Sequence, residues 1–266
     1  MNLHQIILNQ TLNDIRNASY TAVSHAETVN IYLGWLNRID NSDWIPPAML
    51  FLKKHRNKPA LLADFFRRLE RLAAFMHICR YNVNERIEIF ANLISEIEAY
   101  ETLDEMTWLD LSGEEIEQFS ETLNGNVYEF TPRRRNYLML RLDSFIADGA
   151  AKYDPKVLTI EHVLPQTVDD DSEWAEWWPE LDERKAWVHR LANLVPLNKK
   201  KNSAAQNYDF DRKCETYFKG QSDVSSYALT SQVLSKKRWT PAVLEERQKA
   251  LLEVLIDNWD LELEDE

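Results

Sequence analysis

The fold is decided by the segment VLTIEHVLPQ, which runs from Val157 to Gln166. Its opening residues are mostly β-branched and follow Asp154-Pro155, so a short strand is predicted to begin here. Pro165 has no N–H to donate to a strand ladder, which predicts that the strand has ended before it. We therefore expect the pair Glu161-His162 at the carboxyl end of a strand.

A second strand and a helix are predicted downstream. Leu194–Leu197 is another β-favouring run, although Pro196 within it requires a sheet edge or a bulge. Asp209 is a suitable N-cap for a short helix over Phe210–Phe218. The region from about Tyr153 to Tyr217 is thus predicted to fold as strand, strand and helix, in that order.

Helical patterns dominate the rest of the chain. Apolar residues repeat at the i, i+3, i+4 spacing of one helix face in three segments: Leu61–Arg80, Ile87–Ile97 and Tyr137–Phe145. Two capping patterns mark further helix starts: Ser112 with Glu115, and Thr240 before Pro241. The chain holds 5 Gly and 9 Pro in 266 residues, too few turn-formers for a many-stranded sandwich or barrel.

We therefore expect a mainly α fold in two domains. Asp148-Gly149-Ala150 interrupts the preceding helical pattern, so a boundary is placed near Gly149. A helical domain is predicted over residues 1–149. The strand–strand–helix unit, followed by a C-terminal helix, is predicted over residues 150–266.

The two cysteines and the absence of long apolar runs indicate a cytoplasmic protein. Cys79 and Cys214 lie far apart without Cys-x-x-Cys spacing, so neither a disulfide framework nor a zinc knuckle is indicated. The sequence shows no secretory leader pattern and no apolar run of the roughly 20 residues that a membrane span requires. No membrane association is expected.

The formal net charge of −13 argues against a nucleic-acid partner only if its distribution is ignored. Acidic residues concentrate in Asp169–Glu173 and Glu262–Glu266. Basic residues cluster in Arg133–Arg135, Lys199–Lys201 and Lys236–Arg238. Such clusters are most often solvated faces. Of the three, Lys199–Lys201 alone lies close to the candidate catalytic residues.

Glu161 and His162 have the chemistry that phosphodiester hydrolysis needs. An imidazole titrates near neutral pH and can accept a proton from water, and a carboxylate suits a hard divalent cation. Successive strand residues point to opposite sides, so the two can serve one site only where the strand ends or bends.

Three stretches carry a resemblance to a known family. In chain order they are Ile160-Glu161-His162-Val163-Leu164-Pro165-Gln166, Ala192-Asn193-Leu194-Val195-Pro196-Leu197 and Lys201-Asn202. This order resembles HNH (ββα-metal, His-Me finger) nucleases and, more closely, the C-terminal nuclease module of GmrSD-type restriction proteins. That module typically shows Glu-His, two hydrophobic residues and Pro-Gln, then a Gly-Asn-Leu strand, a second Asn and a Lys-bearing helix. Ala192 stands here where Gly is usual.

The resemblance implies a ββα-metal nuclease unit with a role for each matched residue. His162 would be the general base that activates water, and Glu161 and Asn202 would bind the metal, Mg²⁺, Mn²⁺ or another divalent cation. Asn193 would bridge the loop and hold His162 in orientation. Lys213 would contact phosphate.

Further residues have two interpretations each. Lys199, Lys200 and Lys201 are either phosphate contacts or a solvated cluster. His189 is a further candidate for phosphate or metal contact, although local contacts at a helix end are the simpler interpretation. The tryptophans of the acidic segment between the two motif halves could stack on bases, but a small core is favoured because that segment would repel phosphate. They are Trp174, Trp177, Trp178 and Trp187.

We therefore expect a metal-dependent DNA endonuclease, nicking or cleaving both strands, of a bacterial restriction or anti-phage defence system. Two alternatives stay open: a non-cleaving module that binds DNA or a partner, and an RNA-directed nuclease or toxin. The family usually carries an N-terminal nucleotide-dependent module with an Asp-Gly-Gln-Gln-Arg type motif, which this sequence lacks. The chain is accordingly expected to be a fragment of such a protein or its partner subunit.

Overall fold

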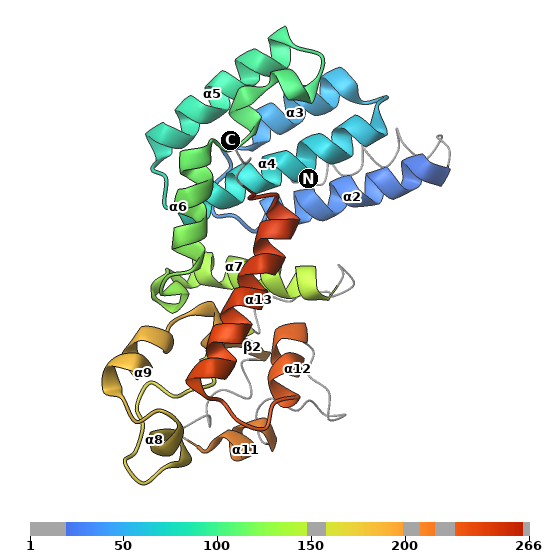
Figure 1. Ribbon diagram of the computed structural model, residues 1–266. Helices are drawn as coiled ribbons and strands as arrows, with labels where there is room; N and C mark the ends of the chain where they lie inside the picture. Colours follow the sequence, from blue (N-terminus) through green and yellow to red (C-terminus); the bar gives the residue numbers. More distant parts are fainter. Residues whose placement is uncertain (1–19, 148–157, 199–207, 216–226, 263–266) are drawn as a thin grey trace. The chain divides into compact units, whose positions relative to one another are not determined.

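The computed structural model describes residues 20–147, 158–198, 208–215 and 227–262. The chain forms two compact units, Met1–Phe119 and Ser120–Glu266, which are considered separately (Figure 1). Most described residues are helical, and the strands found among them form one two-stranded sheet. The predicted mainly α fold is confirmed.

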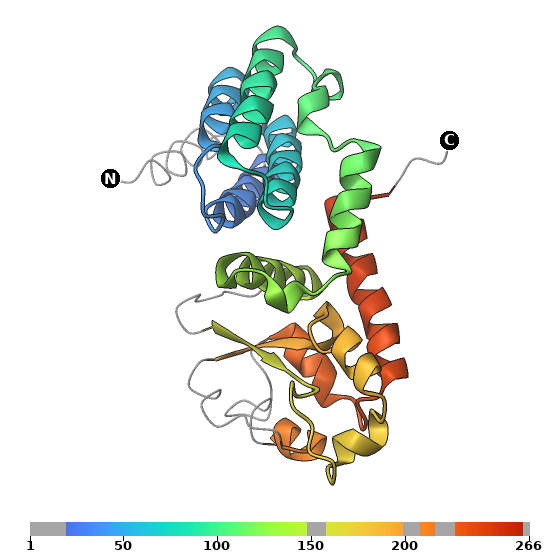
Figure 2. The same cartoon turned by 90° about the vertical axis from the view of Figure 1, so that its left-hand side faces the viewer.

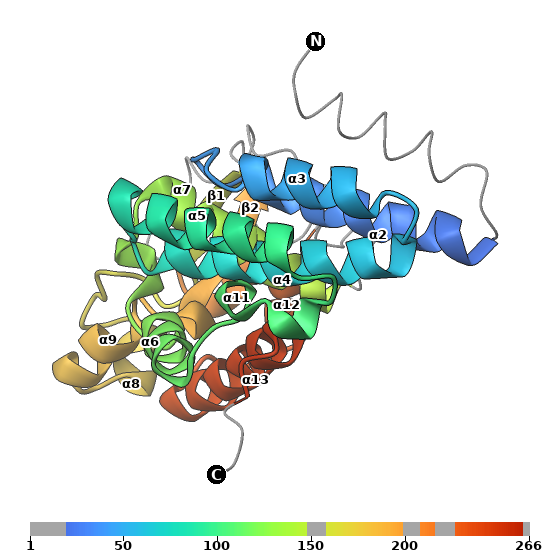
Figure 3. The same cartoon turned by 90° about the horizontal axis from the view of Figure 1, so that it is seen from above.

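The first unit consists of helices packed around α4. Its elements are α2 (Tyr20–Leu36), α3 (Ile45–His55), α4 (Pro59–Ile78), α5 (Val83–Ala99) and the 3-10 turns η1 (Leu103–Glu105) and η2 (Thr107–Leu109). Helices α2 and α3 pack against α4, and α5 packs against α3 and η2 (Figure 3). α6 (Gly113–Leu123) begins in this unit and ends in the next.

α4 confirms the helix predicted within Leu61–Arg80. Its apolar residues at helical spacing, Leu62, Phe65, Phe66 and Leu69 among them, are fully buried. Phe65 stacks on Phe51 of α3 with 3.7 Å between ring centroids. Burial of these rings makes α4 the centre of the core.

α5 confirms the second predicted helix, with one difference. Phe90, Leu93 and Ile97 are buried, but Ile87, expected on the same face, is 54% exposed. The spacing of apolar residues identifies the inward side of a helix, whereas it does not show how far the neighbouring helix extends along that side.

The second unit contains the predicted strand, strand and helix. β1 (Leu158–His162) pairs antiparallel with β2 (Leu194–Asn198), and α11 (Phe210–Lys213) follows. Pro196 lies opposite Ile160 and is tolerated because each strand of a two-stranded sheet is an edge. Residues 216–218 of the predicted helix lie outside the described residues.

Helices surround this hairpin. α7 (Pro132–Ile146) packs against both strands and α12 (Ala228–Leu234) against β2 (Figure 2). α13 (Pro241–Trp259) packs against α7, α9 (Leu181–Trp187) and the turn η5 (Leu191–Asn193). The remaining elements are η3 (Val127–Glu129) and α8 (Glu173–Trp177).

The division between the units differs from the expected boundary near Gly149. It falls between Phe119 and Ser120, because α7 packs against β1, β2, α12 and α13, all in the second unit. The apolar stripe of α7 predicts a buried face, but a stripe does not reveal which partner covers it.

The capping box of Ser112 and Glu115 is present at the start of α6.

The predicted tryptophan core is confirmed. Trp174 and Trp178 are fully buried in one cluster with Phe210 and Trp239, and Trp177 and Trp187 pack against that cluster. The indole Nε1 of Trp178 donates to the carbonyl of Trp239 at 2.6 Å, and that of Trp174 to the carbonyl of Tyr208 at 2.9 Å. The indole N–H groups of Trp174 and Trp178 therefore each have an acceptor, as a dry core requires.

None of the described helices combines the length and the apolar character that crossing a bilayer would demand.

The capping box of α5 provides a test of the first unit. Asn82 accepts hydrogen bonds from the backbone N–H groups of Asn84 and Glu85, and Glu85 accepts one from Asn82 N. We expect Asn82→Ala to lower the free energy of unfolding by about 1 kcal/mol, because helix N–H groups lose their acceptor. Denaturant unfolding of this variant beside Asn84→Ala, which leaves the cap intact, checks the effect. Equal stabilities would show that the cap contributes nothing.

Candidate active site

β1 directs His162 and Glu161 to different sides. Successive strand residues alternate, so Ile160 and His162 are buried whereas Thr159 and Glu161 are partly exposed. His162 is the last residue of β1 and is 4% exposed. The two side chains consequently have different neighbours.

Both ring nitrogens of His162 have a side-chain partner. Nε2 lies 3.2 Å from Nδ1 of His189, and Nδ1 lies 3.3 Å from Nε2 of Gln166. Local contacts, the simpler interpretation of His189 from the sequence, are not what the structure shows, because its imidazole meets a residue 27 positions away. The structure instead brings the two histidines together.

Tyr128 of η3 holds this pair of imidazoles. Its ring centroid lies 4.0 Å from that of His162 and 5.5 Å from that of His189, nearly parallel to the latter. The backbone N–H of Tyr128 donates to the carbonyl of His189 at 3.0 Å. Sequence analysis missed Tyr128, because it lies far from the motif and no local pattern marks it.

Arg135 of α7 covers Tyr128. Its guanidinium carbon lies 4.2 Å from the centroid of the Tyr128 ring, and Nη1 donates to the Tyr128 carbonyl at 2.5 Å. Arg134 is buried, with its guanidinium 4.3 Å from the ring centroid of Phe130. The prediction that Arg133–Arg135 is a solvated face is therefore wrong for two of its members, since a charge run does not show which stems lie along aromatic rings.

Burial and nearby cations keep His162 uncharged. Burial, followed by the charges of His189, Lys213 and Arg135, lowers the pKa of His162 to about 3. At neutral pH the imidazole therefore carries no charge and retains a lone pair on one nitrogen.

Glu161 faces Lys213. The Lys213 ammonium lies 4.0 Å from Oε1 of Glu161. Burial raises the pKa of Glu161, and the Lys213 charge opposes that rise. Burial lowers the pKa of Lys213 to about 8, against the pull of Glu161. The two groups form a partly buried ion pair beside the end of β1.

The expected phosphate contact of Lys213 does not match its position. Lys213 is 1% exposed, and its Nζ donates to the carbonyls of His162 and Val163 at 2.9 and 3.0 Å. A phosphate cannot reach this ammonium in the observed conformation. Instead, the ammonium holds the backbone that carries His162, since buried carbonyls need a donor.

Asn193 fixes the loop that follows His162. Its Oδ1 accepts from Leu164 N at 2.7 Å and from Trp239 Nε1 at 3.1 Å. Its Nδ2 donates to the carbonyls of Leu164 at 3.0 Å and Val188 at 2.9 Å. The backbone carbonyl of Asn193 accepts from Val163 N. Asn193 thus bridges the loop, and it acts on His162 through the backbone.

α13 supports the same region from the other side. Gln248 Oε1 accepts from the backbone N–H of Ala192, and Arg247 Nε donates to the Ala192 carbonyl. Arg247 also donates to Gln232 Oε1 and the Leu229 carbonyl. Ala192 is fully buried among these contacts.

One of the two expected metal ligands, Glu161, lies among the described residues. Among them, no group of at least three His, Cys, Asp or Glu side chains is arranged to hold an ion. Glu161, partly exposed and with a carboxylate, fits a hard divalent cation. Asn202, the second expected ligand, and Lys199, Lys200 and Lys201 lie outside the described residues.

Removing the Asn193 amide tests its bracing role. We expect Asn193→Ala to lower the free energy of unfolding by about 3 kcal/mol, because buried N–H and carbonyl groups of the loop lose their partners. The matched control is Asn258→Ala, which removes an exposed amide bonded only locally to the Val254 carbonyl and should cost less than about 0.5 kcal/mol. Thermal and denaturant unfolding measure both. A loss as small as that of the control would contradict the assigned role.

Comparison with known proteins places these features in a family. No curated protein matches the chain significantly. The model of the family described as GmrSD restriction endonucleases, C-terminal domain, matches residues 113–254, which is more than half of the chain. The matched range contains β1, β2, the two histidines and Lys213. The chain therefore belongs to the family of the GmrSD restriction endonuclease C-terminal domain.

Proposed function

We propose that this protein is a metal-dependent DNA endonuclease of a bacterial restriction or anti-phage defence system, with His162 as its general base. Support comes from family membership and from one observation in particular. A buried, uncharged imidazole is fixed at the end of β1 between Gln166, His189 and Tyr128. Such an imidazole can take a proton from water at neutral pH.

The geometry favours Nδ1 of His162 as the atom that receives the proton. Nε2 faces His189, whereas Nδ1 faces the side chain of Gln166, which is exposed. An attacking water would take the place of the Gln166 amide at Nδ1. His189 at Nε2 would then keep the ring in its orientation while the proton is transferred.

Glu161 and Asn202 would hold a Mg²⁺ or Mn²⁺ ion. When bound, the ion would supply positive charge at the phosphate oxygens and the leaving group. Lys213, beside Glu161, would keep that carboxylate ionised and in place. Lys199, Lys200 and Lys201, which precede Asn202 directly, would bind the DNA backbone.

The remaining expectations also belong to this proposal. A nucleotide-dependent module, on the same polypeptide or on a partner subunit, would select the DNA, and the complex would act in the cytoplasm. The proposed chemistry acts on a phosphodiester and does not depend on the identity of the base, so target choice would come from that module.

Substitution of His162 tests the proposal. We expect His162→Ala to reduce nicking of supercoiled plasmid, in Mg²⁺ or Mn²⁺, by about 10²–10⁴-fold, because the attacking water loses its base. His25→Ala, which removes an imidazole from the first unit, should leave the rate unchanged. His162→Gln serves as a second variant if thermal unfolding shows that alanine perturbs the fold.

Three results would change the proposal. Wild-type protein that nicks no better than His162→Ala, even with its nucleotide-dependent module supplied, would exclude the enzyme. Tight DNA binding in the same assay would then favour a non-cleaving module. Faster cleavage of RNA than of plasmid would replace DNA as the substrate.

The metal requirement is tested separately. EDTA should abolish nicking, and Glu161→Gln should raise the Mg²⁺ concentration for half-maximal nicking by at least about tenfold, because the ion loses a charged ligand. The matched control is Glu253→Gln, an exposed carboxylate 4.0 Å from Lys249. An unchanged Mg²⁺ requirement in Glu161→Gln would remove Glu161 from the metal site.

A further inference from the structure

A groove lies beside the imidazole pair. It is lined by the consecutive residues Pro165–Val168 and by one face of α9 and the turn after it, and its volume is about 240 Å³. The lining residues of that face stand at i, i+3, i+4 and i+7: Leu181, Arg184, Lys185 and Val188. All of these residues belong to the second unit.

The groove is continuous with the candidate active site through two residues. Gln166, in its lining, contacts Nδ1 of His162 at 3.3 Å. Val188, also in its lining, directly precedes His189 and accepts a hydrogen bond from the Asn193 amide. A strand whose phosphodiester reaches His162 would therefore continue into this groove.

The groove combines unsatisfied positive charge with an apolar wall. Nε of Arg184 is buried and has no hydrogen-bond partner among the described residues. Lys185 lies 3.7 Å from the fully exposed carboxylate of Asp182, an arrangement that holds the ammonium only weakly. Leu181 is 55% exposed and, with Pro165, offers an apolar surface. Asp182 and Glu183 do not line the groove.

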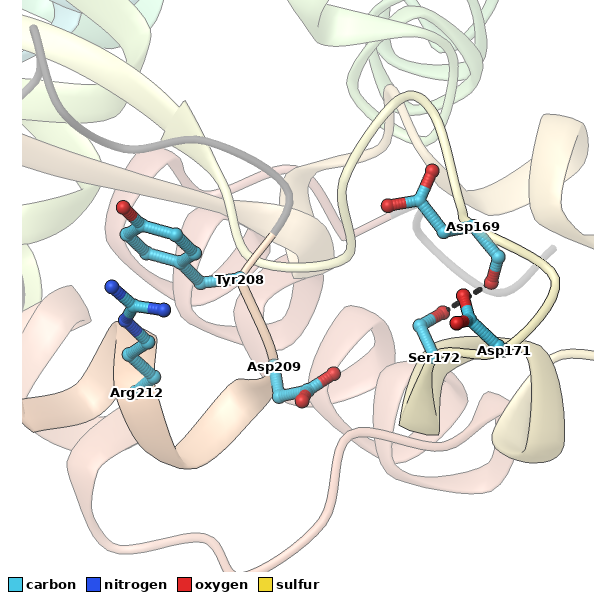
Figure 4. Close-up of a pocket in the computed structure, with 6 residues that line it drawn as sticks. All are labelled: Asp169, Asp171, Ser172, Tyr208, Asp209 and Arg212. Atoms are coloured by element: carbon cyan, nitrogen blue, oxygen red, sulfur yellow. Dashed lines mark hydrogen bonds between the residues drawn. The ribbon is translucent and has the colours of Figure 1, made fainter.

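A second hollow, adjoining the next part of the same loop, has the opposite character. Figure 4 shows its lining: Asp169, Asp171, Ser172, Tyr208, Asp209 and Arg212. The Arg212 guanidinium stacks on the Tyr208 ring at 3.5 Å, which leaves the three carboxylates dominant. Burial, followed by the charges of Asp211 and Asp209, raises the pKa of Glu173 nearby. This side of the loop repels a polyanion, so a strand is directed to the groove.

We propose that the groove binds the nucleic-acid strand next to the scissile phosphodiester. Arg184 and Lys185 bind a backbone phosphate each, and Pro165 and Leu181 contact the adjoining sugar or base. The inference rests on the proposed function only in taking a nucleic acid as the ligand.

The salt dependence of DNA binding tests the groove without any cleavage. The full chain is titrated, in EDTA, into a short fluorescein-labelled duplex at several salt concentrations, and anisotropy is read. We expect Arg184→Gln and Lys185→Gln each to reduce the slope of log K against log salt by about 0.9, and to weaken binding roughly eightfold at about 0.1 M salt. Arg184→Lys should retain the slope, because the charge is kept.

The single variant Lys236→Gln is the matched control, since it also removes one positive charge, here from an exposed surface. Slopes equal to wild type in both groove variants, or changes no larger than those of the control, would overturn the proposal. So would an absence of binding by the unsubstituted chain at the lowest salt. A chain that binds with the expected slopes but never cleaves would retain the groove and exclude the enzyme, so the two failures are distinguishable.

Discussion

The position of the candidate base depends on one buried amide. The side chain of Asn193 bonds to both backbone polar groups of Leu164, to the Val188 carbonyl and to the Trp239 indole. Buried backbone groups need partners, so these bonds stabilise the observed conformation of the loop at Leu164, after β1. The imidazole at the end of that strand is thereby fixed before any substrate is bound.

Local sequence patterns predicted most of the helices and both strands, but only some of the residues that surround His162. Apolar spacing located α4, α5 and α7, and β-favouring runs located both strands, because these signals lie within a few residues of each other. Tyr128 and Arg135 escaped prediction, since they reach His162 only through tertiary packing. The division of the chain into units between Phe119 and Ser120 also depends on tertiary packing, which local patterns do not show.

Charge was the least predictable property. Lys213 carries the charge that phosphate binding requires, yet its ammonium is used by two backbone carbonyls and lies near Glu161. The sequence shows which side chains are charged, whereas the folded structure determines how far each charge is buried and which groups it contacts. The groove that ends at Val168 is lined by Arg184 and Lys185, whereas the hollow that begins at Asp169 is lined mainly by carboxylates. The net charge of −13 for the whole chain does not reveal this local excess of positive charge in the groove.

The order of elements along the chain affects when the site can form during synthesis. Ala192, which precedes the bracing Asn193, is bonded to Arg247 and Gln248 of α13. A nascent chain on the ribosome therefore exposes β1, β2 and both histidines before the helix that secures them has been translated. Ala192 and the residues that follow it therefore lack the contacts of Arg247 and Gln248 until α13 emerges.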